Sequence, residues 1–372
     1  MKIRFVLILL ALASTAFASQ EKPLIGLSLD TLKEERWQRD RDTFIAEAKK
    51  LGATVIVQSA NSDDTRQVRD IESLISRNVD VLVIVPHNGA AMTRAVKSAN
   101  QAKIPVIAYD RLILNANIDY YLTFDNVKVG EAQASYAVER LPKDRTARIV
   151  RIYGAPTDNN AKLLRDGQMN ILKPAVDRGD VKVISDQFAR EWKAQEAQRL
   201  TEDALTKTKN DIQAIVASND GTAGGAISAL DVAGLTGKVL VTGQDAQLDA
   251  VQRIAKGTQT MTIYKPIKPL ADSAVDSAVK LARGEALNAF DKINNGRVDV
   301  PAILHEPQAV DRENLMATVV KDGYHKYEDV YKDVPPDQRP KQTAGDERKS
   351  DGPLLAIAAL LLGGLGVALR LR

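Results

Sequence analysis

The sequence predicts an α/β protein made of two doubly wound lobes. Short apolar runs rich in β-branched residues alternate along the chain with longer amphipathic stretches. Strands that are apolar on both faces, each followed by a helix, are typical of parallel sheets covered on both sides. About nine such units are more than one open sheet usually holds. A chain of 372 residues with 44% hydrophobic content also exceeds one ordinary core, which favours two lobes.

The expected strands follow one another at intervals filled by segments of helical period. Four strands are expected in the first third of the chain, at residues 24–29, 54–60, 81–86 and 105–110. Five more are expected further along, at residues 147–154, 181–187, 214–220, 239–245 and 260–265. Amphipathic helical segments separate the early strands, at residues 41–52, 65–78 and 91–102.

The N-terminal residues predict an export signal. Lys2 and Arg4 precede an apolar run at residues 5–13, and the Ala-Phe-Ala of residues 16–18 has the small-x-small pattern of a signal peptidase site. We therefore expect a signal peptide at residues 1–18 and an exported mature protein. A membrane anchor or an ordinary first helix fits less well, because the apolar run is short and the cleavage pattern follows directly.

The C-terminal end combines a polar segment with an apolar one. Residues 329–352 are rich in proline, glycine and charge, which predicts a disordered linker. In the last segment, 353–372, seventeen uncharged residues span roughly 26 Å as a helix, against about 30 Å of bilayer hydrocarbon, and arginines follow. We expect this tail to be a transmembrane anchor in the inner membrane or a removable sorting signal, and favour the anchor because no cleavage motif precedes it. Uniform apolarity disfavours a helix packed on the body.

Charge and motif content exclude several classes of function. The cations at the two ends account for the formal charge of +3, so the body offers no basic footprint for nucleic acid. The absence of cysteine excludes disulfides, thiol nucleophiles and thiolate metal sites. The chain lacks GxSxG, GxGxxG, P-loop and HExxH motifs and the alternating oxygen spacing of a calcium loop. We therefore expect no enzyme activity, no cofactor and no metal.

Polar side chains stand at the carboxyl ends of several expected strands. Loops at these ends of a parallel sheet converge, and helix N-termini point their free N–H groups at the same place. Such positions are held by Asp110 and Arg111, by Asp158, Asn159 and Asn160, by Asn219 and Asp220, by Gln244 and Asp245, and by Lys265. Polar residues at five strand ends in one chain predict a shared ligand cleft. His87 also follows an expected strand and is a further candidate for the cleft wall, as a hydrogen-bonding group rather than a base.

Each of these residues has an ordinary structural alternative. Asp158 and Asp220 precede expected helices, and for both we favour the role of helix N-cap. Asn219 stands one residue closer to its strand, which slightly favours the ligand site. The adjacent Asp110 and Arg111 could form a surface ion pair of little energetic weight.

Lys265 and the two tryptophans also have ordinary alternatives. Lys265 precedes Pro266 and could be the solvated start of a helix. Trp37 and Trp192 lie in charged surroundings, KEERWQRD and FAREWKAQ, which favours exposure toward a cleft. Two aromatic planes with acids, amides and cations around them suit a sugar, because its C–H faces stack and its hydroxyls donate and accept. The alternative is that each tryptophan fastens its own helix to the sheet.

Several long segments of the chain are shared with one family. They include RWQRDRDTF, DVLVIVPHNG, AYDRLI, DNNAKLLRDGQM, VASNDGTAGGAI and GTQTMTIYKP. In these segments the chain resembles the type I periplasmic binding proteins of sugar ABC transporters. The resemblance implies two Rossmann-like lobes and a hinge of three crossovers, near Phe124 and at residues 262–264 and 301–304. The implied N-terminal lobe comprises residues 19–124 and 264–302, and the C-terminal lobe comprises residues 125–263 and 303–328.

The resemblance also implies a function and a set of contacts. It implies a monomeric periplasmic protein that captures a pentose, D-xylose before others, and delivers it to an ABC transporter permease. Sugar contacts are implied at Arg36, Trp37, Asp110, Arg111, Asn159, Asn160, Trp192, Asn219, Asp245 and Lys265. The chain departs from the family at His87, where a tyrosine is common, and at residues 190–191, which bears on the choice of sugar.

Three other functions are compatible with a two-lobed sugar-binding fold. The ligand-binding domain of a transcriptional repressor would need a DNA-binding motif at the N-terminus, where the export signal stands. An enzyme acting on sugars would need an acid–base pair, and none stands at a readable spacing. The ligand-binding component of a sugar chemosensor would have the same binding chemistry, so this alternative stays open.

Overall fold

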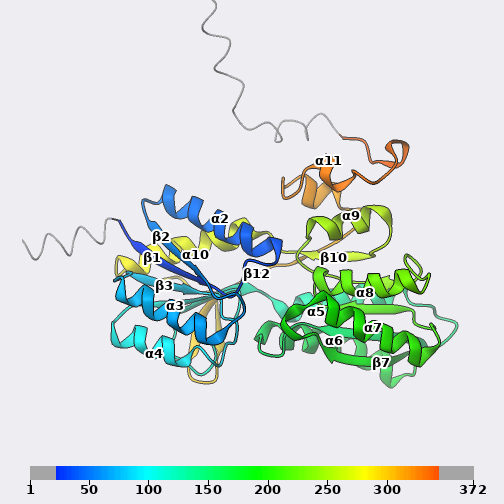
Figure 1. Cartoon of the computed structure of the whole chain (residues 1–372), viewed down its shortest axis with the longest axis horizontal. Helices are drawn as coiled ribbons and strands as arrows, with labels where there is room; N and C mark the ends of the chain where they lie inside the picture. The colour runs from blue at the N-terminus through cyan, green and yellow to red at the C-terminus, as the bar shows by residue number, and fades with distance from the viewer. Residues whose placement is uncertain (1–21, 343–372) are drawn as a thin grey trace, which may run out of the picture.

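The computed structural model describes residues 22–342 as two α/β lobes that lie side by side (Figure 1). The two lobes and their helix-covered sheets confirm the fold class predicted from the sequence. The predicted signal peptide at residues 1–18 and the apolar tail at residues 353–372 lie outside the described residues. Between residues 22 and 342, no helix is both long and apolar enough to cross a membrane.

The N-terminal lobe is built on a seven-stranded sheet of order β11-β12-β5-β4-β3-β1-β2. All neighbouring strands are parallel except β11 and β12, which form an antiparallel edge. The strands are β1 (Leu24–Leu29), β2 (Thr54–Ser59), β3 (Val81–Ile84), β4 (Val106–Tyr109), β5 (Tyr120–Phe124), β11 (Asp291–Asn294) and β12 (Asp299–His305).

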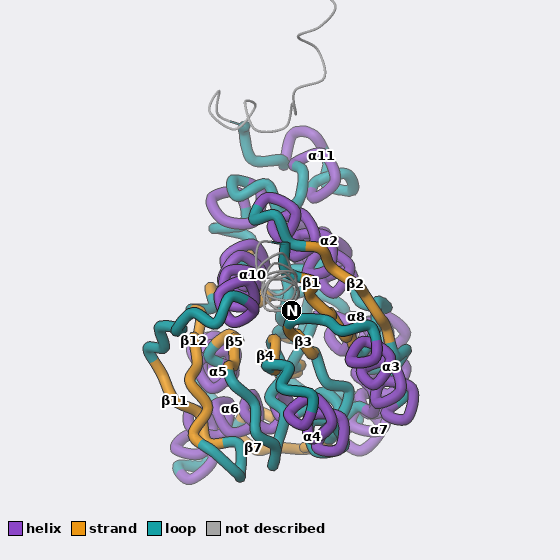
Figure 2. The backbone as a smooth tube through the Cα atoms, turned by 90° about the vertical axis from the view of Figure 1, so that its left-hand side faces the viewer, coloured by secondary structure: helices purple, strands orange, loops and turns teal. Residues whose placement is uncertain are grey.

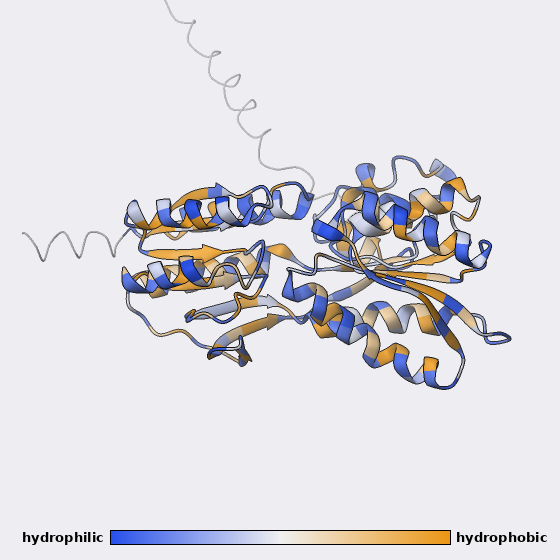
Figure 3. Cartoon of the chain, turned by 60° about the horizontal axis from the view of Figure 1, so that its bottom comes forward, coloured by the Kyte–Doolittle hydropathy of each residue, from blue (hydrophilic) through white to orange (hydrophobic). Residues whose placement is uncertain are grey.

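Helices cover both faces of this sheet, as Figure 2 shows. They are α2 (Glu35–Lys50), α3 (Asp64–Ser76), α4 (Thr93–Gln101) and α10 (Ile267–Ala282). Residues of α2 and α10 form one buried core with one face of the strands, and residues of α3 and α4 form a second core on the other face. Figure 3 shows the same layering, with apolar strands between helices that turn polar faces outward.

The C-terminal lobe has a smaller parallel sheet of order β7-β6-β8-β9 and a separate antiparallel pair, β10 with β13. The strands are β6 (Ala147–Tyr153), β7 (Val181–Phe188), β8 (Ala214–Ala217), β9 (Leu240–Val241), β10 (Met261–Tyr264) and β13 (Gln308–Asp311). The helices are α5 (Asn126–Arg140), α6 (Asn159–Asp177), η1 (Arg190–Trp192), α7 (Ala194–Thr208), α8 (Asp220–Val232), α9 (Leu248–Lys256), η2 (Met316–Val320), α11 (Tyr327–Val330) and η3 (Pro336–Gln338).

Three crossovers join the lobes. The first is at Asp125, directly after β5, close to the expected Phe124. The second is at residues 265–266 and the third at residues 306–307, each a little later than the sequence suggests. The reason is strand pairing, because β10 stays paired with β13 up to Tyr264 and β12 stays paired with β5 up to His305.

The linker predicted from residue 329 is wrong over its first part. Residues 329–342 continue the C-terminal lobe, because Val330, Tyr331 and Val334 are buried in a cluster that includes residues of α9 and β13. Burial of these three apolar side chains stabilises a packed conformation of this segment, although its overall composition is polar. The rest of the predicted linker, residues 343–352, lies outside the described residues.

Candidate functional site

A cavity lies between the two lobes. Most of the lining residues lie at strand ends or helix starts, where the loops of the two lobes meet. The lining residues are Glu34, Arg36, Trp37, Asp110, Arg111, Asn126, Asp158, Asn160, Leu164, Trp192, Asn219, Gln244, Asp245 and Lys265.

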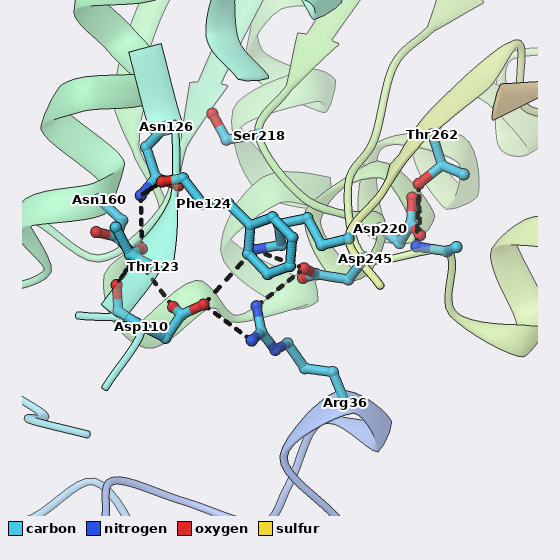
Figure 4. Close-up of polar contacts among 12 residues, drawn as sticks. Arg36, Asp110, Thr123, Phe124, Asn126, Asn160, Ser218, Asp220, Asp245 and Thr262 are labelled. Atoms are coloured by element: carbon cyan, nitrogen blue, oxygen red, sulfur yellow. Dashed lines mark hydrogen bonds and ion pairs between the residues drawn. The ribbon is translucent and has the colours of Figure 1, made fainter. Parts of the chain in front are cut away.

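Arg36 connects carboxylates from both lobes, as Figure 4 shows. Its Nη2 lies 2.9 Å from Asp110 Oδ2 in the N-terminal lobe, and its Nη1 lies 3.3 Å from Asp245 Oδ1 in the C-terminal lobe. Lys265 Nζ lies 3.0 Å from the same Asp245 oxygen. Burial alone would raise the pKa of the Asp110 carboxyl, but the neighbouring cations, Arg36 first, lower it below its ordinary value. The Asp110 carboxylate is therefore held ionised beside buried cations.

A second network of ion pairs is centred on Arg111 and also connects the two lobes. Arg111 lies 2.6 Å from Asp30 Oδ2 through Nη1 and 2.9 Å from Asp158 Oδ2 through Nε. Asp158, in turn, accepts a hydrogen bond of 3.2 Å from Trp192 Nε1. His87 Nδ1 lies 2.9 Å from Asp30 Oδ1, and neither residue is among the cavity lining. His87 therefore contacts the partner of Arg111 and does not line the cavity.

The two tryptophans approach the cavity from opposite lobes. Trp37 is only 4% exposed, and the guanidinium carbons of Arg36 and Arg111 lie 4.3 and 5.1 Å from the centre of its ring. Trp192 lies directly over Gly154, where a Cβ atom would be 2.0 Å from the indole Cζ2. The position of the Trp192 ring therefore requires a residue without a side chain at 154.

Three lining residues have backbone conformations that are strained for any residue except glycine. Their φ angles are +60° at Asp110, +56° at Trp192 and +95° at Asp245. Such conformations cost on the order of 1–3 kcal/mol each and cluster at ligand sites, where surrounding contacts hold them. At Asp110 the carbonyl oxygen accepts hydrogen bonds from Tyr121 Oη at 3.1 Å and Thr123 Oγ1 at 2.7 Å.

Three buried acceptors of the cavity lining have no hydrogen-bond partner among the described residues. They are Glu34 Oε2, Asn160 Oδ1 and Gln244 Oε1. The Asn160 amide nitrogen, in contrast, donates to Asp110 O at 3.0 Å and to Asp110 Oδ1 at 3.1 Å, which orients the free oxygen. Buried polar atoms nearly always have a hydrogen-bond partner, so these oxygens are available to accept hydrogen bonds from a ligand. Together with the carboxylates and cations they suit a small ligand with several hydroxyl groups.

The structure brings together nine of the ten residues for which the resemblance implied sugar contacts. The exception is Asn159, which begins α6 and is absent from the cavity lining. Asp158 is the N-cap of α6 as predicted, accepting from Asn160 N at 2.9 Å, and also lines the cavity. The N-cap prediction for Asp220 is wrong, because Asn219 caps α8 by accepting from Thr222 N at 2.9 Å.

Three lining residues were outside both the strand-end set and the implied contacts: Glu34, Asn126 and Leu164. Asp158 and Gln244 were in the strand-end set, although the resemblance implied no sugar contact for them. Asn126 follows β5, and this strand was missing from the sequence prediction. No site residue was therefore predicted at its carboxyl end.

The fold and the cavity define a binding protein that encloses a small polar ligand between two lobes. Residues 25–286 match the periplasmic binding protein domain, and the chain belongs to this family. The prediction of a binding protein rather than an enzyme is therefore confirmed.

Curated relatives and solved structures agree with this family. The chain is 50% identical to the D-xylose-binding periplasmic protein of Haemophilus influenzae, over 89% of this chain and 100% of the relative. It is also 50% identical to the protein of that name from Escherichia coli K12, over 88% and 99%. An ABC transporter solute-binding protein from Clostridium phytofermentans with bound β-D-glucose superposes with a TM-score of 0.78 at 31% identity, covering 82% of this chain and 99% of that chain.

Proposed function

We propose that this protein captures a pentose, D-xylose before others, in the periplasm and delivers it to the permease of an ABC importer. The observation that carries the proposal is the cavity itself, which gathers charged, amide and aromatic side chains from both lobes around three unpaired buried acceptors. The two relatives that are 50% identical to this chain are named D-xylose-binding periplasmic proteins, which supports D-xylose as the sugar.

The residues of the cavity divide into two kinds of proposed contact. Carboxylate and amide oxygens, of Asp110, Asp245, Asn160 and Gln244, accept hydrogen bonds from sugar hydroxyls. Buried cations and amide N–H groups donate to the hydroxyl oxygens, from Arg36, Arg111, Asn219 and Lys265. The rings of Trp37 and Trp192 stack on the C–H faces of the pyranose.

The charged wall of the cavity favours a pentose over a hexose. A pentopyranose lacks the exocyclic CH₂OH group of glucose, so it needs less room beside this wall. A sugar with an additional CH₂OH group binds much more weakly if this group pushes apart side chains that are hydrogen-bonded to one another. Buried charges would then lose their partners. The ion pairs among Arg36, Asp245 and Lys265 form such a wall.

Ligand binding and lobe closure are proposed to be one event. A sugar that contacts Asp110 in one lobe and Asp245 in the other gains its full set of contacts only in the closed form. The ligand therefore shifts a hinge equilibrium toward closure by its preference for that form. The three crossovers at Asp125 and residues 265–266 and 306–307 are the segments that would bend.

Isothermal titration calorimetry with D-xylose, L-arabinose, D-ribose and D-glucose tests the proposal. We expect one sugar per chain, with D-xylose bound most tightly. Asp245→Asn should weaken D-xylose binding by about 10- to 100-fold, because it removes a charged hydrogen-bond partner inside the cavity. Asp249→Asn is the matched control, since this carboxylate lies four residues further on and is 62% exposed. Absence of binding to all four sugars, or equal losses in the two variants, would reject the proposal.

A further inference from the structure

A second set of contacts joins the lobes outside the cavity. Glu35 and Arg39 belong to α2 of the N-terminal lobe and are linked to each other at 2.7 Å. Glu35 Oε2 accepts from Leu248 N, at the start of α9, at 3.0 Å, and Arg39 Nη1 donates to Tyr324 O at 2.8 Å. Leu248 and Tyr324 pack in the C-terminal lobe, and none of these four residues lines the cavity.

His325 lies at the centre of these contacts and is only 4% exposed. Its Nε2 lies 2.7 Å from Ala246 O, and its Nδ1 lies 3.2 Å from Arg39 Nη2. A carbonyl oxygen can only accept and a guanidinium can only donate, so the proton belongs on Nε2 and Nδ1 offers its lone pair. The contact with Arg39 therefore requires the neutral imidazole, whereas the contact with Ala246 requires only the proton on Nε2.

We propose that His325, Arg39 and Glu35 form a pH-sensitive latch, in which neutral His325 holds the lobes closed and its protonation weakens sugar binding. This inference rests on the proposed sugar-binding function. A proton on Nδ1 would face the Arg39 guanidinium, so the hydrogen bond between the two lobes would be lost and two cations would come together.

The latch acts on the same loop that supplies Asp245 to the cavity. Ala246, the partner of His325, follows Asp245 directly, and Tyr324 Oη lies 3.4 Å from Asp245 O. Asp245 and Ala246 both have positive φ angles, +95° and +48°, so this loop depends on surrounding contacts for its shape. A movement of the His325 ring away from Arg39 would therefore be passed through Ala246 to Asp245 and the sugar.

The groups that face His325 come from both lobes. Burial first, and then the Arg39 cation of α2, lower the pKa of His325 below its ordinary value, against the opposing effects of Glu35 and of Asp329 of α11. A lowered pKa means that the closed form binds fewer protons than the open or unfolded form. The latch is therefore intact above the ordinary histidine pKa of about 6.5 and is lost as the pH falls below it.

The dissociation constant for D-xylose at pH 7.5 and pH 5.0, in the full chain and two variants, tests the latch. We expect wild-type binding to be about tenfold weaker at pH 5.0 than at pH 7.5, because the closed form binds fewer protons than the open form. His325→Gln keeps a donor for Ala246 and an acceptor for Arg39 but does not titrate, so its dissociation constant should change much less. The same substitution at His87, which contacts the partner of Arg111 instead, should leave the pH response in place. A response that survives in His325→Gln, or that disappears in His87→Gln, would overturn the latch.

The titration of His325, followed by NMR with saturating D-xylose so that the lobes are closed, tests the latch apart from the sugar affinity. Removing the Arg39 cation by Arg39→Gln should raise the pKa of His325 in the closed form, and an unchanged pKa in a protein that binds D-xylose would overturn the latch alone. Absence of binding to all four sugars would overturn the proposed function instead, so the two failures are distinguishable.

Discussion

At the scale of single residues, the site depends on features that a sequence does not display. The strand-end pattern predicted Asp110, Asn160 and Asp245, because polar residues after buried strands converge on a cleft. It could not predict the left-handed backbone of Asp110 and Asp245 or the unpaired oxygen of Asn160, since these arise from contacts between distant segments. Asn159 is the opposite case, a residue that was predicted but does not line the cavity. Its position in the motif suggested a sugar contact, but the residue begins α6 outside the lining.

Gly154 gives a prediction at the same scale. Gly154→Ala would place a Cβ atom 2.0 Å from the Trp192 ring and force the ring away from the cavity. We expect D-xylose affinity to fall at least about tenfold, since an aromatic stacking contact of about 1–1.5 kcal/mol is lost and the hydrogen bond to Asp158 is strained. Calorimetry measures the loss. Gly221→Ala is the control, because its Cβ would meet only ordinary contacts of 3.6 Å or more. Equal affinities of Gly154→Ala and the wild type would contradict the proposed role of Trp192.

At the scale of helices and strands, most of the fold followed from periodicity. The nine expected strands correspond to β1–β4 and β6–β10, whose apolar runs are buried on both faces or bounded by clear turns. The missing strands have weaker signals. β5 is short and rich in tyrosine, β12 contains Pro301, and β11 is an exposed edge strand that pairs only with β12. Their pairing is determined by neighbours far away in the chain.

The contact between α5 and α6 gives a prediction at this scale. A Cβ atom on Gly167 of α6 would lie 2.1 Å from Val127 O of α5, so Gly167→Ala must push the two helices apart. We expect the free energy of unfolding to fall by about 1–3 kcal/mol, as is usual for overpacking. Urea unfolding measures the change. Gly224→Ala, also within a helix but with its nearest contact at 3.4 Å, should show no such loss. A stable Gly167→Ala variant would mean that the helices do not approach this closely.

At the scale of the whole molecule, the arrangement of charges argues for closure around a ligand. Arg36 of the N-terminal lobe reaches Asp245 of the C-terminal lobe, and Arg111 of the N-terminal lobe reaches Asp158 of the C-terminal lobe. Buried ion pairs add little net stability, since desolvation opposes their attraction. Their presence at the interface between the lobes is better explained by a ligand that shares them. Family resemblance predicted the two lobes, but the ends of the crossovers and the packing of residues 329–342 became clear only from strand pairing and burial.

Small-angle X-ray scattering with and without saturating D-xylose tests closure around the sugar most directly. The account predicts that the radius of gyration of the wild-type protein decreases when D-xylose is added and that Asp245→Asn at the same sugar concentration shows a smaller decrease, because the sugar then loses a contact in one lobe. A radius of gyration that does not change in wild-type protein saturated with D-xylose would contradict the account.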